Sequence, residues 1–207
     1  GSQMVTLFIL VSGFSLYLGE RRRLLAGRPS TLAGFFRRRA WRILPPYYVA
    51  LAIAAAWWWA WPAARAPLGT VLDPTAPSPE GVGAHLLLAH HLDPAWITQL
   101  NPPLWSIPYE VQLYGLFPLL FLLATRLPAP VGFGLGLAGF LAAREAGLVG
   151  YLNFFEAFLG GMAMAHLAGE GPRRLAQAGA AAGLVTLAYA GWQGPATYGY
   201  AWVFGFM

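Results

Sequence analysis

The stretch LWSIPYEVQLYGLFPLLFLLAT, residues 104–125, has one charged side chain, that of Glu110. About 20 such residues are enough to cross the hydrocarbon core of a bilayer as a helix. Further uncharged runs occupy residues 1–19, 43–64 and 175–207. Because only helices and closed barrels satisfy their backbone in lipid, these runs predict an all-α, polytopic transmembrane helix bundle. We expect about six to seven membrane segments within one membrane domain, residues 1–207.

The composition excludes other classes of protein. Hydrophobic residues make up 57% of the chain and charged residues 10%, too few charges to cover a water-soluble globule. All thirteen basic residues are arginines, against eight acids. Because the arginines stand beside apolar runs, the positive-inside rule explains them better than a nucleic-acid partner does, and the expected partner is the lipid bilayer. The absence of cysteine excludes disulfides and thiolate metal sites.

The distribution of arginines predicts the topology. Segment 20–42 holds eight of them and is interpreted as an Arg-rich cytoplasmic loop, broken at Gly27-Arg28-Pro29-Ser30. Segment 63–83, rich in proline, is interpreted as an extracytoplasmic loop, and the apolar piece 84–91 is too short to span. Eleven of the thirteen arginines then lie on one side, which predicts an integral membrane protein whose Arg-rich loop faces the cytoplasm.

Two interpretations of the arginine clusters stay open. Arginines beside a membrane commonly set topology and bind lipid head groups. Alternatively, their guanidinium groups bind the phosphates of a substrate bidentately. Arg39 and Arg42 are three residues apart at the predicted start of a helix, just before Pro45-Pro46, and would share a face.

Glu110 is the sharpest candidate for a functional residue. It lies six residues after Leu104, about 9 Å along the predicted helix. An ionisable side chain inside the membrane is energetically costly, so its presence indicates a functional site. Pro108 and Pro118 would bend or open the helix around it. The alternative is a structural clamp, in which a buried arginine or hydroxyl pairs with the acid.

The remaining polar residues favour structural roles. His85 and His90 do not share a helical face and no carboxylate or thiolate completes a set with His91, so no metal site is predicted. Glu156 and His166 lie near the ends of a predicted span, where a cap and an interfacial histidine are expected. Gly160-Gly161 indicates close helix packing.

Four stretches of the sequence are informative when they are taken together. They are TLFILVSGF at 6–14, FFRRRAWRILPPYY at 35–48, NPPLWSIPYEVQLYGLF at 101–117 and FLGGM at 158–162. Together, in this order, they resemble the motifs of the acyltransferase 3 family of integral membrane O-acyltransferases. The sequence departs from the family pattern at Pro108 and Tyr109, and at Leu113, where an aromatic residue is usual.

The resemblance implies transfer of an acyl group from acyl-CoA, a co-substrate rather than a cofactor, to a hydroxyl of a carbohydrate or other envelope acceptor. It implies a catalytic role for Glu110. The residues that it implies for substrate binding are Arg39, Arg42, Tyr47, Trp105, Ser106 and Tyr114.

The family's first helix carries a basic residue and a histidine, whereas residues 4–18 match its second helix. The chain is therefore expected to be a fragment of a longer acyltransferase 3-like domain. Two alternatives remain at this point. One is a non-catalytic, transporter-like or scaffold bundle, and the other is an inactive truncated remnant.

Overall fold

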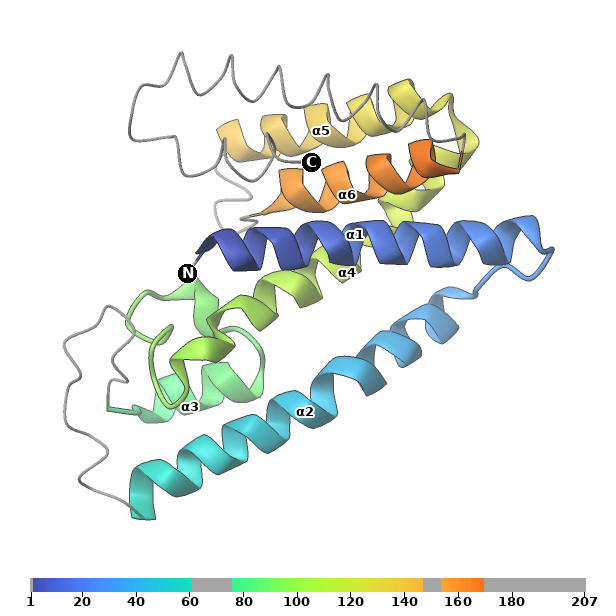
Figure 1. Ribbon diagram of the computed structural model, residues 1–207. Helices are drawn as coiled ribbons and strands as arrows, with labels where there is room; N and C mark the ends of the chain where they lie inside the picture. Colours follow the sequence, from blue (N-terminus) through green and yellow to red (C-terminus); the bar gives the residue numbers. More distant parts are fainter. Residues whose placement is uncertain (1, 61–75, 147–153, 170–207) are drawn as a thin grey trace. The chain divides into compact units, whose positions relative to one another are not determined.

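The computed structural model describes residues 2–60, 76–146 and 154–169. In these ranges the chain forms helices and no strand, so the predicted all-α class is confirmed. The six α-helices, labelled in Figure 1, are α1 (Ser2–Leu25), α2 (Leu32–Ala60), α3 (Pro79–Leu86), α4 (Ile107–Arg126), α5 (Ala129–Glu145) and α6 (Phe155–Ala168).

Within the described ranges, two stretches are long and apolar enough to cross a bilayer, Leu32–Ala60 and Pro102–Arg126, and Ala129–Ala143 is a shorter apolar helix. The count of six to seven membrane segments stays a prediction. The expected helices within 175–207 lie outside the described residues. The helices fall into two compact units, one containing α1, the end of α4, α5 and α6, the other containing α2, α3 and the start of α4.

In the first unit, α1 and α6 pack together along their lengths, as Figure 1 shows. A Cβ on Gly13 would collide with the carbonyl of Phe158, and one on Gly161 would collide with the carbonyl of Leu10. The two backbones are therefore in direct contact, which only glycine permits. The predicted close packing is confirmed at Gly161, whereas at Gly160 a Cβ would meet nothing within 4 Å among the described residues.

In the second unit, α2 packs on α3 and on the segment before α4. The buried residues Tyr47, Leu51 and Leu100 form its core. The Tyr47 hydroxyl donates to the carbonyl oxygen of His85 at 2.7 Å, and the Tyr48 hydroxyl donates to that of Leu86 at 2.8 Å. The Tyr48 bond satisfies a carbonyl at the end of α3, and the His85 carbonyl accepts the Leu88 N–H at 3.1 Å as well as the Tyr47 hydroxyl.

Segment 20–42 is not a loop throughout, which corrects the predicted boundaries. Helix α1 continues to Leu25 and α2 begins at Leu32, because arginine is a good helix former. The chain turns only at Gly27, whose φ is 69°, and Pro29. Pro45-Pro46 is not a helix start either, since both prolines lie inside α2.

The predicted loop 63–83 needs a similar correction, because its last five residues belong to α3. The Ser78 side chain accepts a hydrogen bond from the Gly81 N–H at 3.0 Å, and Pro79 follows as the first helical residue. Serine at the N-cap and proline at the first position are standard start signals that the loop interpretation overlooked. Residues 61–75 lie outside the described residues.

Candidate active site

Glu110 lies in the first turn of α4, and only 5% of it is exposed. The α-helix starts at Ile107 because residues 102–106 form a 3-10 turn, and the two together make the apolar stretch Pro102–Arg126 that contains Glu110. Pro108 sits where its missing N–H would have no helical partner, so it does not bend the helix. Pro118 alone lies inside α4. A carboxylate in a first turn is stabilised by the helix dipole.

Tyr114 contacts Glu110 directly. It lies one turn further along α4, it is equally buried, and its hydroxyl donates a hydrogen bond to the Glu110 carboxylate. The spacing of four residues brings the two side chains onto one face of the helix. A hydroxyl partner for the acid is what the structural-clamp alternative expects, so both interpretations of Glu110 stay open.

Arg39 of α2 packs on the same tyrosine. Its Cζ lies 5.7 Å from the centroid of the Tyr114 ring and 5.9 Å from that of Phe35, both within the range of cation–π attraction. The Arg39 Nε is buried and has no hydrogen-bond partner among the described residues. The Arg39–Tyr114–Glu110 cluster thus places a guanidinium on the ring whose hydroxyl fixes the acid.

The other predicted substrate-binding residues have different surroundings. Arg42 is exposed, whereas Arg39 is half-buried, so the two arginines do not share one environment as expected. Trp105 contacts Tyr109 edge to face, with 5.9 Å between ring centroids, and Ser106 is half-buried at the end of the 3-10 turn. Tyr47 lies against α3, bound to His85 as described above.

A stacked histidine pair is the main feature that sequence reasoning missed. The rings of His85 and His90 are fully buried and lie face to face, with centroids 3.9 Å apart. The expectation that their spacing separates them is wrong because the chain is not helical between them. Leu88 has a φ of 56°, and the chain reverses there.

Hydrogen bonds to backbone carbonyls orient both rings. His85 Nδ1 lies 2.9 Å from the Gly81 oxygen and His90 Nε2 lies 3.3 Å from the Leu104 oxygen, which assigns the proton of each ring to that nitrogen. Burial, with the neighbouring His85, lowers the pKa of His90 to about 4. Burial also lowers the pKa of His85. The pair is therefore neutral at pH 7.

Three ligands for a metal ion do not converge here. Among the residues that the structure describes, no group of three or more histidine, aspartate or glutamate side chains is placed to hold a metal. The adjacent His91 instead contacts Gln112 through its Nε2 and the Tyr109 ring edge to face.

The first unit holds a separate polar cluster on α1 and α6. The Tyr17 hydroxyl lies 2.6 Å from His166 Nδ1, and Arg21 donates to the carbonyl oxygen of His166 at 2.7 Å. His166 is therefore tied to a fully buried tyrosine and is more than an interfacial histidine. Glu156 is exposed in the first turn of α6, a position that suits a capping acid.

These features define a class, the membrane-associated helical proteins with a buried acidic site. The model of the acyltransferase 3 family, described as an acyltransferase domain, matches residues 1–207. The chain belongs to this family, as its four motifs predicted.

One curated relative with significant similarity is Acyltransferase MdmB of Streptomyces mycarofaciens, which is 31% identical over 130 residues. The alignment covers 62% of this chain and 30% of that protein, so the match spans about a third of the relative's length. No solved structure matches the chain significantly.

Proposed function

We propose that the chain is part of a membrane O-acyltransferase that moves an acyl group from acyl-CoA to a hydroxyl of a carbohydrate or other envelope acceptor. Membership of the acyltransferase 3 family supports acyl transfer. The observation that carries the assignment of the site is the buried Glu110 carboxylate, fixed by Tyr114 beside a stacked arginine.

The proposed acyl transfer requires a negative charge at a fixed position near the base. The acceptor oxygen attacks the thioester carbonyl, the carbon–sulfur bond breaks, and the thiol of CoA leaves with the proton that the hydroxyl gave up. A base becomes positively charged while it carries that proton. A carboxylate held rigidly near the base lowers the energy of this state, because it needs no reorganisation during the reaction. Glu110 suits this role since Tyr114 restricts its rotation.

The two arginines would have different roles. Arg42 is exposed and offers its guanidinium fork to a phosphate of CoA. Arg39 is held against Tyr114 and so supports the ring whose hydroxyl binds Glu110. Tyr47, Trp105 and Ser106 complete the proposed substrate contacts on the strength of the motifs.

The proposed location is the cytoplasmic membrane of a bacterium, with the arginine-rich ends of α1 and α2 on the cytoplasmic side. Acyl-CoA is a cytoplasmic metabolite, so this orientation brings the donor to the arginines. The arginines in the last turn of α1 and those at 37–42 support it through the positive-inside rule.

The test compares Glu110→Gln with Glu80→Gln in the full-length protein. Glu80 is a matched control, because it also lies in the first turn of a helix but is exposed. We expect acyl transfer by Glu110→Gln to fall on the order of 10²-fold with little change in melting temperature, while Glu80→Gln keeps both. Strong destabilisation of Glu110→Gln with unchanged turnover per folded molecule would identify a structural clamp instead.

A further inference from the structure

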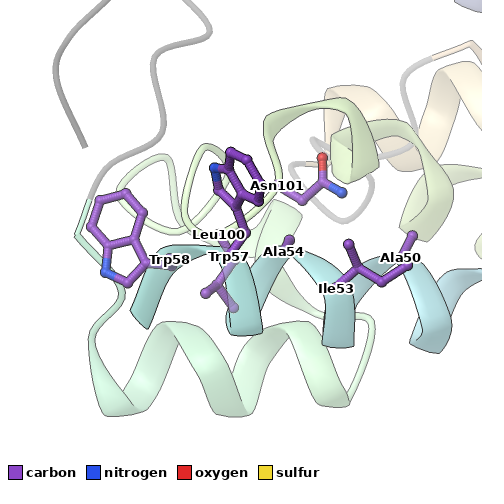
Figure 2. Close-up of a pocket in the computed structure, with 7 residues that line it drawn as sticks. All are labelled: Ala50, Ile53, Ala54, Trp57, Trp58, Leu100 and Asn101. Carbon is purple, nitrogen blue, oxygen red and sulfur yellow. The ribbon is translucent and has the colours of Figure 1, made fainter. Parts of the chain in front are cut away.

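The second unit contains a groove of about 400 Å³ between α2 and the segment before α4 (Figure 2). On the α2 side its wall is Ala50, Ile53, Ala54 and Trp57, residues spaced so that they share one helical face. Trp58, Leu100 and Asn101 complete the lining, and none of the seven residues is charged. The groove contains no member of the Arg39–Tyr114–Glu110 cluster.

The groove exists because two alanines stand where larger side chains would fill it. Ala50 and Ala54 are one turn apart on α2, and Figure 2 shows both among the residues that line the groove along this helix. The neighbouring face of α2, with Tyr47 and Leu51, packs on Leu100. The wall of the groove is thus backed by the core of the unit and is preformed.

A tight turn positions the one amide of the groove. Leu100 has a φ of 59°, and the Asn101 N–H donates to the carbonyl oxygen of Gln99 at 2.7 Å, which closes a three-residue γ-turn. A buried leucine in this backbone region is strained, and such strain gathers at binding sites.

The Gln99 side chain stabilises this turn through two hydrogen bonds. Its Oε1 accepts the N–H of Ser78 at 3.0 Å, and its Nε2 donates to the carbonyl oxygen of Ala95 at 3.1 Å. The Asn101 side chain does not cap the 3-10 helix that follows it. Its carboxamide lies at the groove, where the NH2 group can donate hydrogen bonds and the oxygen can accept them.

We propose that this groove binds a neutral, hydroxyl-bearing ring of the acceptor, a sugar ring being the simplest case. The inference rests on the proposed acyl transfer to a hydroxyl and adds where and how the acceptor is recognised. The apolar C–H face of the ring lies on the Trp57 indole, and a ring hydroxyl binds the Asn101 carboxamide.

The lining favours this ligand over two others. A phosphate or carboxylate would lose its water here without any opposite charge in return. A lipid acyl chain would cover the Asn101 amide without a hydrogen bond, which is unfavourable too. A volume of about 400 Å³ lies within the range of small-ligand sites.

The experiment measures binding alone, so it does not depend on acyl transfer. Full-length protein in nanodiscs, without acyl-CoA, is titrated with methyl glucoside, with glucuronate as a charged probe and 1-octanol as an apolar one, using saturation-transfer NMR. Trp57→Ala is compared with Trp59→Ala, a tryptophan two residues away that is equally exposed but does not line the groove. Ala54→Phe fills the groove without removing a tryptophan, and Asn101→Ala removes the amide.

We expect methyl glucoside to bind more tightly than glucuronate. The Trp57→Ala, Ala54→Phe and Asn101→Ala variants should each weaken its binding by about threefold or more, while Trp59→Ala leaves it unchanged. Equal binding in Trp57→Ala and Trp59→Ala, no binding of methyl glucoside, or loss confined to 1-octanol would overturn the proposal. Glucoside binding that follows this pattern in a protein without acyl transfer would overturn the proposed function and leave the groove assignment standing.

Discussion

Tyr114 donates its hydroxyl to the Glu110 carboxylate from the next turn of the same helix, and both side chains are buried. The bond fixes the position of the carboxyl group. Because Arg39 stacks on the ring of Tyr114, movement of the tyrosine would disturb the acid and the guanidinium together.

The first prediction concerns that hydroxyl. Tyr114→Phe keeps the ring under Arg39 but removes this hydrogen bond to the carboxylate, and a hydrogen bond to a charged group contributes about 1.5 to 3 kcal/mol. We expect kcat to fall about tenfold or more with KM nearly unchanged, measured as acyl transfer by the full-length protein. Tyr48→Phe, which removes an exposed hydroxyl bonded to Leu86, is the control. A loss of stability without a loss of kcat would show that the bond is structural.

The second prediction separates the two interpretations of the arginines. Arg42 and Arg22 are both exposed, but Arg42 lies one turn after Arg39 and Arg22 lies in the last turn of α1. Arg42→Ala should weaken acyl-CoA binding about tenfold, because a charge-assisted contact to phosphate is lost, while Arg22→Ala should leave it near wild type. Calorimetric titration with acyl-CoA measures both. Small, equal losses would favour lipid head groups as the partners of these arginines.

The third prediction follows from the neutral histidine pair. The pKa of His90 is about 4 in the folded protein and near its ordinary 6.5 when unfolded. Above pH 6.5 His90 is neutral in both the folded and the unfolded protein. Between pH 6.5 and 4 only the unfolded protein takes up the proton. The free energy of unfolding therefore decreases by up to about 3 kcal/mol as the pH is lowered through this range. Unfolding in denaturant across this range measures it. His90→Phe keeps a ring against His85 and should remove most of this slope, whereas an unchanged slope would contradict the buried pair.

The fourth prediction compares two adjacent glycines of α6. Gly161→Ala forces α1 and α6 apart, because its Cβ meets the backbone of Leu10, and overpacking of this kind costs about 1 to 3 kcal/mol. Gly160→Ala meets no described atom and should stabilise the helix by up to about 1 kcal/mol. The melting temperatures of the two variants in one detergent should therefore shift in opposite directions. Equal shifts would exclude the direct contact of the two backbones.

The fifth prediction tests the orientation. The chain contains no cysteine, so a single introduced cysteine reports its own position. Arg28→Cys should react with a membrane-impermeant maleimide only from the cytoplasmic side, and Glu80→Cys only from the outer side; both positions are exposed. Labelling of both from the same side would overturn the assignment of α2 as a single span.

Much of the fold was predictable because hydrophobic length and turn residues act locally. The break at Gly27 and Pro29 and the apolar span that contains Glu110 are properties of neighbouring residues, and the structure retains both. The helix ends were less predictable. Arginine favours a helix as readily as it marks a membrane boundary, so α1 and α2 extend into the segment interpreted as a loop.

The site was predictable where its residues share one helix. Glu110 and Tyr114 are four residues apart, so their contact follows from helical geometry. The stacking of His85 on His90 depends on the positive φ of Leu88. Leucine rarely adopts this backbone conformation, so the sequence around it does not predict the contact. Nor does spacing indicate that Tyr17 meets His166, because that contact requires the tertiary packing of α1 on α6.

The glycine contact between α1 and α6 also bears on biosynthesis. The chain between Leu25 and Phe155 must be made before α1 can meet α6, which takes on the order of ten seconds at typical rates of translation. During that interval the face of α1 that carries Gly13 has no α6 to pack on. In a nascent chain stalled before residue 155, α1 should therefore crosslink to the insertion machinery or to lipid. Once α6 has been synthesised and packs on α1, this crosslinking should decrease.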